Sequence, residues 1–171
     1  MISASRPPVL VLTFLLLTAK FLPAQTTAAY PRAVGYLSVI HPLVSVNKDG
    51  ATYNFSGSYT VGFPCGVNIL KSDRVGFSFE LVPFITSSGG TSKTNNFLFH
   101  PGVMFRYPKG FTFLTRLAFE TSGRYGASAV FNKVVFHTKM NNYFVAMPLL
   151  LRFGNDKPAS VATGLQLGVT F

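Results

Sequence analysis

The feature that most constrains this chain is a regular alternation of large apolar and small polar side chains. In residues 53–69, YNFSGSYTVGFPCGVNI, the odd positions are mostly aromatic or aliphatic and the even positions are mostly small or polar. Successive side chains of a β-strand point to opposite faces, so this period predicts a strand with one apolar and one polar face. A tilted strand crosses a bilayer with roughly 9–11 residues. We therefore expect residues 53–69 to form one long strand that projects beyond the membrane.

Further strands are expected along the rest of the chain. Six ranges besides the first are predicted as strands: 34–46, 75–85, 97–107, 111–120, 143–153 and 161–171. A barrel that begins and ends on the same side of a membrane needs an even number of strands. We place the eighth strand at 128–139, where the alternation is poorest because Lys133 and His137 share a face with apolar residues.

The connections differ in length, which predicts two barrel ends with different surroundings. Residues 71–73, 107–110 and 154–158 are expected to be tight turns, while 47–51, 87–96 and the region 121–142 are longer. Within the last region, residues 123–142 carry Arg124, Lys133 and Lys139. These cations could bind lipopolysaccharide phosphates or another surface ligand, because loops on rigid barrels often carry recognition. The alternative is a solvated loop charge without a ligand.

The composition of the two faces indicates which of them meets lipid. A soluble lipocalin-like barrel also alternates, but its apolar face points inward and its outer face is charged. Here only 12% of the residues are charged, against about 25% in a typical soluble domain. The polar face is built of Gly, Ser, Thr and Asn, which suit a narrow interior. The sequence therefore predicts an all-β fold, a transmembrane antiparallel up-and-down β-barrel of eight strands.

Five charged residues lie within the clear strands, all on the small polar face. They are Glu80, Arg106, Arg116, Glu120 and Arg152. A charge that faces lipid at mid-depth costs about 2–4 kcal/mol for Arg, which explains their exclusion from the apolar face. Unpaired interior charges are also costly, so we predict a network that plugs the lumen, with Glu80 near Arg116 and Glu120 near Arg152. The alternative is a charged constriction in a porin-like conducting pore.

The N-terminus has the features of an export signal. Arg6 precedes the apolar run VLVLTFLLL at 9–17, and small residues follow. This pattern predicts a cleaved signal peptide at 1–24, with the barrel domain at 25–171. Cleavage after Ala28 and an uncleaved anchor helix are the alternatives.

The remaining polar residues indicate no catalytic, cofactor or metal site. The formal net charge is +10, but the cations are scattered and no base-stacking or zinc motif accompanies them, so nucleic acid is not an expected partner. Cys65 is the only cysteine, and we expect a buried or lipid-facing thiol there. No serine is placed beside a histidine and an acid by any readable spacing, so we expect no enzyme activity and a structural role for His100.

The last strand carries a family resemblance. TGLQLGVTF ends the chain on Phe171, with Val169, Leu167 and Leu165 at alternate positions before it. With the export signal and the alternation, this resembles the small outer-membrane β-barrel proteins of Gram-negative bacteria. The resemblance implies a C-terminal signal for the barrel-assembly machinery and contact with outer-membrane lipid and lipopolysaccharide. Because such barrels include structural proteins, adhesins and lipid-modifying enzymes, we expect a structural or surface-interaction role. A lipid-modifying enzyme that uses His100 or His137 and a soluble periplasmic lipocalin-like barrel are the alternatives.

Overall fold

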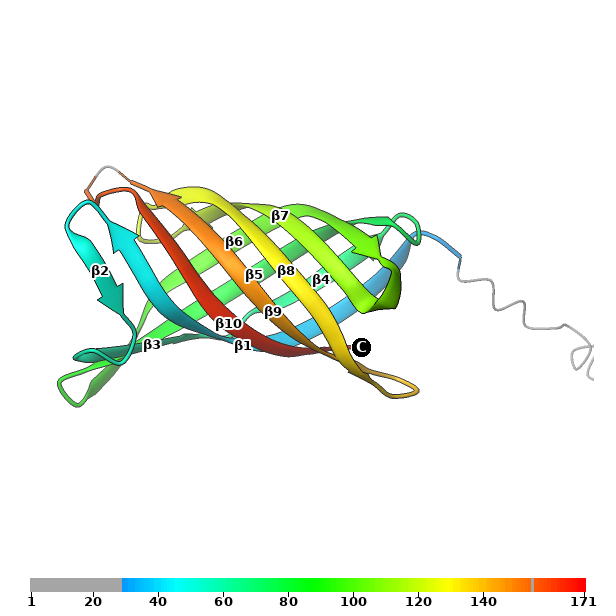
Figure 1. Cartoon of the computed structure of the whole chain (residues 1–171), viewed down its shortest axis with the longest axis horizontal. Helices are drawn as coiled ribbons and strands as arrows, with labels where there is room; N and C mark the ends of the chain where they lie inside the picture. Colours follow the sequence, from blue (N-terminus) through cyan, green and yellow to red (C-terminus); the bar gives the residue numbers. More distant parts are fainter. Residues whose placement is uncertain (1–28, 155) are drawn as a thin grey trace, which may run out of the picture.

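The chain folds into one antiparallel sheet that closes on itself (Figure 1). The computed structural model describes residues 29–154 and 156–171, so the predicted signal peptide at 1–24 lies outside the described residues. The strands are β1 (Arg32–Asn47), β2 (Gly50–Tyr53), β3 (Ser58–Gly62), β4 (Cys65–Leu70), β5 (Val75–Ser88), β6 (Thr91–Tyr107), β7 (Phe111–Glu120), β8 (Tyr125–His137), β9 (Asn142–Phe153) and β10 (Ser160–Thr170), with a single turn of 3-10 helix, η2 (Pro108–Gly110).

Closure comes from the pairing of the first and last strands. β10 pairs antiparallel with β1, from Tyr36 opposite Thr170 to Asn47 opposite Ser160. β3 and β4 occupy one position between β1 and β5, and β2 extends that position along β1, so the strands fill eight positions around the ring. The predicted eight-stranded up-and-down barrel is confirmed, including the uncertain strand at 128–139, which is β8 and begins three residues earlier than expected.

No helix within residues 29–154 and 156–171 is both long enough and apolar enough to span a lipid bilayer.

The long strand expected at 53–69 is interrupted. The predicted alternation of inward and outward side chains holds, but the chain leaves the sheet after Tyr53 and again before Cys65, which gives three strands, β2, β3 and β4. The side chain of Asn54 both donates to the carbonyl of Thr60 and accepts from its N–H, each at 2.8 Å, so a side chain replaces two ladder bonds. Pro64 has no N–H for the ladder at the second break. Local side-chain chemistry thus divides a strand whose period is uniform.

The connections differ from the prediction in three places. The longer connection expected at 47–51 is a tight turn, because β1 continues to Asn47 and pairs there with Gly50 of β2. The expected loop at 87–96 is a tight hairpin, because β5 and β6 continue to a turn of Gly89 and Gly90, both with positive φ. The region 123–142 is a wall strand with a turn at each end, so Arg124 and Lys139 lie at opposite ends of the barrel. We call the end that holds Arg32, Phe171 and the turns at 71–74, 108–110 and 138–141 the terminal end, and the opposite end the far end (Figure 1).

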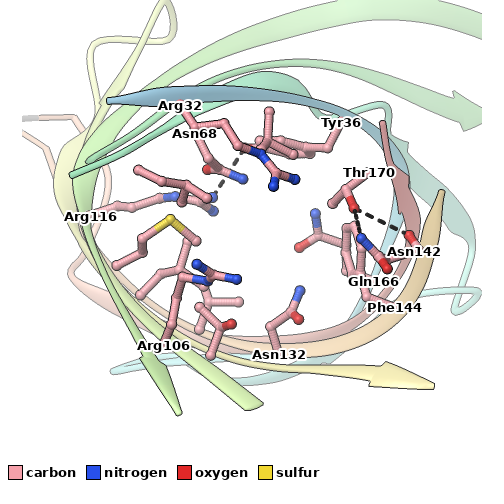
Figure 2. Close-up of a pocket in the computed structure, with 16 residues that line it drawn as sticks. Arg32, Tyr36, Asn68, Arg106, Arg116, Asn132, Asn142, Phe144, Gln166 and Thr170 are labelled. Carbon is pink, nitrogen blue, oxygen red and sulfur yellow. Dashed lines mark hydrogen bonds between the residues drawn. The ribbon is translucent and has the colours of Figure 1, made fainter. Parts of the chain in front are cut away.

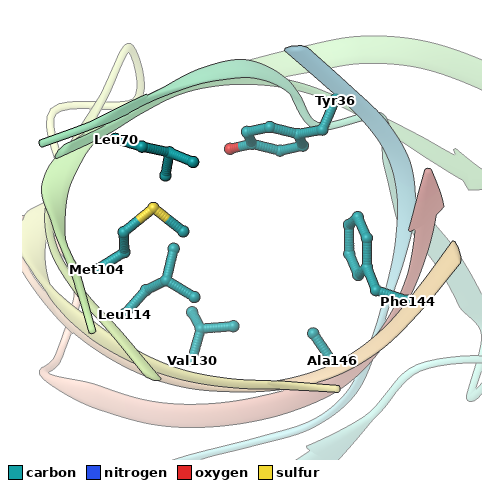
Figure 3. Close-up of a cluster of buried hydrophobic side chains, with 7 residues drawn as sticks. All are labelled: Tyr36, Leu70, Met104, Leu114, Val130, Phe144 and Ala146. Carbon is teal, nitrogen blue, oxygen red and sulfur yellow. The ribbon is translucent and has the colours of Figure 1, made fainter. Parts of the chain in front are cut away.

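The apolar face points outward, as expected for strands that meet lipid. Exposed large apolar side chains on this face include Leu37, Phe77, Phe79, Leu81, Phe99, Leu117, Phe119, Phe131, Leu149, Leu151, Leu165 and Leu167. The interior is less polar than the sequence suggested. A terminal-end cluster consists of Tyr36, Leu70, Met104, Leu114, Val130, Phe144 and Ala146 (Figure 3). A second cluster, nearer the far end, consists of Ile40, Val82, Leu98 and Ala118.

Candidate functional site

The centre of the lumen is occupied by the carboxylate of Glu80. It projects inward from β5, directly opposite His100 of β6 in the strand register, and is 4% exposed. His100 Nδ1 lies 2.9 Å from Glu80 Oε1, and the Tyr36 hydroxyl donates to Oε2 at 2.8 Å. The Arg116 guanidinium on β7 donates to Oε1 at 3.2 Å. Both oxygens of this buried carboxylate therefore have partners, as a charge out of water requires.

Arg116 extends into the lumen past a glycine on the neighbouring strand, which has no side chain to block it. Its Nη2 donates to the Ser78 hydroxyl at 2.8 Å and to the Tyr36 hydroxyl at 3.1 Å. The residue opposite Arg116 on β6 is Gly102. A Cβ at Gly102 would lie 2.5 Å from Arg116 Cγ, so only glycine leaves room for the arginine stem.

The contacts continue from His100 toward the far end. His100 Nε2 lies 2.8 Å from the Ser128 hydroxyl, which also accepts from Arg152 Nη1 at 3.1 Å. Arg152 Nε donates to Glu120 Oε1 at 2.8 Å, and the Asn96 amide donates to Oε2 at 2.8 Å. One connected set of polar side chains therefore runs through the lumen. We call it the lumen network; its members are Tyr36, Ser78, Glu80, Asn96, His100, Arg116, Glu120, Ser128 and Arg152.

Four of the five predicted interior charges belong to the lumen network. The structure brings Glu80 to Arg116 and Glu120 to Arg152, in the pairs that their depth suggested. Arg106 lies outside it, six residues along β6 from His100 and thus roughly 20 Å away. Among the described residues it has no carboxylate within 4.0 Å. An inward-facing charged side chain therefore does not necessarily belong to the lumen network.

Ser128 was not predicted from the sequence as a member of the network. Glu80, His100 and Ser128 lie in the order of an acid, a base and a hydroxyl, with the two histidine nitrogens facing the other two groups. The spacing along the chain gives no hint of this, because the three residues come from β5, β6 and β8. Only the register of the strands, Glu80 opposite His100 and Arg116 opposite Ser128, brings them together.

Two cavities lie on either side of the lumen network. The terminal-end cavity has a volume of about 120 Å³, and Arg32, Arg106 and Arg116 are among the residues that line it (Figure 2). The far-end cavity has a volume of about 370 Å³, and Glu120, Arg124, Arg152 and Lys157 contribute to its lining. Neither is lined by His100 or Ser128, which are 3% and 5% exposed.

No cluster of acidic, histidine or cysteine side chains within the described ranges could hold a metal ion.

Comparison with known proteins bears on the fold. No protein-family model matches the chain, and no curated protein matches it. Among solved structures, the chain is similar to a de novo designed transmembrane β-barrel, with 11% sequence identity and a TM-score of 0.53 over 84% of this chain and 97% of the designed one. The fold is that of a transmembrane β-barrel. Another designed protein, TMB2.3, studied by solution NMR, has 15% identity and a TM-score of 0.38 over 81% of this chain and 94% of its own.

Proposed function

We propose that the protein is an integral outer-membrane β-barrel of a Gram-negative bacterium, closed to solutes, with a structural or surface-interaction role and no chemistry of its own. The observation that carries this proposal is the lumen network, which joins Tyr36 of β1 to Asn96 of β6 through hydrogen bonds. Its partners are outer-membrane lipid and lipopolysaccharide, and the barrel-assembly machinery during insertion.

The width of the lumen and its contents support closure. Eight strands enclose an interior just wide enough for side chains to fill. The lumen network occupies the middle, the terminal-end cluster adjoins it, and the second cluster lies beside its Glu120 half, where Leu98 is opposite Glu120. A hydrated ion would have to break buried pairs such as Glu80–Arg116 to pass, and breaking such a pair costs about 3–5 kcal/mol.

Planar-bilayer recording tests closure. We expect the wild-type protein to show no single-channel steps, and the double variant Glu80→Ala/Arg116→Ala to conduct, because it removes two side chains that fill the lumen. Lys93→Gln, on the exposed part of β6, is the control and should stay silent. Wild-type conductance that changes with Glu80→Gln would instead favour the charged constriction of a pore.

Electrophoresis and fractionation test the location. A closed lipid-facing barrel migrates differently in SDS before and after boiling, and we expect that shift for protein recovered from the outer-membrane fraction. Recovery from the soluble periplasm without a shift would favour a lipocalin-like binding barrel.

The second candidate function is a lipid-modifying enzyme, which the order Ser128–His100–Glu80 favours. Against it, Arg152 also donates to the Ser128 hydroxyl, and neither cavity reaches that oxygen. Hydrolysis of lipid A esters by the detergent-solubilised protein, lost in Ser128→Ala and in His100→Gln while both variants keep the heat-dependent shift, would establish the enzyme. No hydrolysis by the wild type is the result we expect.

A further inference from the structure

We propose that the terminal-end cavity binds a small organic anion, a molecule with one phosphate or carboxylate group beside a short apolar part. The cavity has a volume of about 120 Å³. Liquid water occupies about 30 Å³ per molecule, so the space holds an anionic group and a few attached carbon atoms. This proposal goes beyond the closure proposed above: the cavity shares Tyr36 and Arg116 with the lumen network, and the other members of the network do not line it.

The first argument is the uncompensated positive charge of the cavity. Arg32 from β1, Arg106 from β6 and Arg116 from β7 line it, and none of the carboxylates within residues 29–154 and 156–171 does. Arg116 is neutralised by Glu80, but Arg32 and Arg106 have no carboxylate within 4.0 Å in the described part of the chain. Figure 2 shows the guanidinium groups of Arg32 and Arg106 directed into the hollow. Guanidinium groups bind carboxylate and phosphate through paired hydrogen bonds.

The second argument is that buried polar atoms at the cavity lack partners. Arg116 and Asn68 both line it and are 6% and 8% exposed. Arg116 Nε and Asn68 Oδ1 have no hydrogen-bond partner among the residues that the structure describes. A buried donor without an acceptor is costly, and an anion oxygen would supply that acceptor to Arg116. Rotation of the Asn68 amide would present its NH₂ group to the same ligand.

The third argument is the apolar part of the lining. Leu70, Met104, Leu114 and Phe144 face the same space (Figure 3). A bare inorganic anion would leave these side chains in contact with water. Ligand sites commonly combine an apolar wall with a few convergent polar groups, and this combination selects an anion that carries carbon.

Calorimetric titration tests the site in the full-length protein. The protein is held in maltoside micelles, whose uncharged head groups supply no phosphate. Phenyl phosphate is the probe, inorganic phosphate carries only the charge, and benzyl alcohol carries only the ring. We expect saturable binding of phenyl phosphate, weaker binding of inorganic phosphate, and none of benzyl alcohol. The NMR resonance of Arg116 Nε–H should move as phenyl phosphate binds. Equal affinity for the two phosphates would overturn the apolar part of the proposal.

Matched variants separate the cavity from the general charge of the terminal end. Arg32→Gln and Arg106→Gln should each weaken phenyl phosphate binding by about tenfold, since each removes a charge-assisted contact. Lys109→Gln removes an exposed cation that does not line the cavity, and should leave the affinity unchanged. Leu114→Phe fills the space at constant charge and should abolish binding. An equal loss in Lys109→Gln, or full binding by a heat-modifiable Leu114→Phe, would overturn the proposal.

A second arm identifies the source of the anion. The same titration is made in bilayer discs of uncharged galactolipid and of phosphatidylglycerol. Weaker apparent binding of phenyl phosphate in phosphatidylglycerol supports occupation of the site by a lipid head group, and equal binding supports a soluble organic anion. Absence of binding in both discs and in micelles would overturn the proposal.

Discussion

His100 on β6 and Ser128 on β8 are joined by a 2.8 Å hydrogen bond that passes over the strand between them. In the register of β7 and β8, Ser128 is opposite Arg116, and the next inward residue of β7 is Ala118, which is fully buried and presents only a methyl group. Ala118 lies between the two charged residues of β7, Arg116 and Glu120. The bond between His100 and Ser128 therefore joins the two halves of the lumen network, one around each charge pair, next to a small side chain on β7.

Ala118→Leu should destabilise the barrel by about 1–3 kcal/mol, because the larger side chain overpacks a site with no free space. The measurement is the free energy of unfolding in urea, with the protein in lipid vesicles. Ala127→Leu makes the same change on the outward face, where the residue is exposed, and should have little effect. Equal losses in the two variants would mean that the crossing at Ala118 is not tightly packed.

The Glu80–Arg116 pair should behave as a coupled unit. Glu80→Gln leaves a buried guanidinium without its charge partner, and Arg116→Met leaves a buried carboxylate, so each should cost about 3–5 kcal/mol. The double variant Glu80→Gln/Arg116→Met should cost clearly less than the two together. The exposed Lys48–Asp49 pair is the reference, with a coupling of about 0–1 kcal/mol. Additive losses at Glu80 and Arg116 in the vesicle unfolding assay would contradict the network.

The period-two alternation predicted which side chains of each strand face inward. It could not predict the register between strands or the local side-chain contacts. Parity along each strand separates inward from outward residues, so the interior position of Glu80 followed from the sequence. The contact between His100 and Ser128 depends on how three strands are aligned, which the alternation within one strand does not show. Irregularities such as the one between Phe84 and Ile85, which shifts the register of β5 and β6, are equally hidden from it. The break after Tyr53 depends on the hydrogen bonds of the Asn54 side chain, and the alternation gives no sign of them.

Phe171 should matter more for assembly than for the finished barrel. Its backbone exchanges two hydrogen bonds of 3.0 Å with Gly35, which helps to close the ring, while its side chain is exposed. Phe171→Ala keeps the backbone bonds but removes the aromatic end of the expected assembly signal. We expect a lower fraction of heat-modifiable protein in the outer membrane of cells, with little change in unfolding free energy. Phe153→Ala, an outward aromatic residue at the far end, is the control; an equal fall there would contradict a special role for Phe171.

Cysteine labelling of intact cells should establish the orientation of the barrel. β5 and β6, of 14 and 17 residues, extend past their neighbour β7 at the far end and carry the turn Gly89–Gly90. An even number of strands places both chain ends on the same side of the membrane. In the proposed outer-membrane location we expect that side to be the periplasm, so this hairpin should face outward. In a Cys65→Ser background, Lys93→Cys should react with a membrane-impermeant maleimide in intact cells. Lys139→Cys, in a terminal-end turn, should react only after the outer membrane is permeabilised. The reverse pattern would invert the barrel, and the terminal-end cavity would then open to the exterior instead of the periplasm.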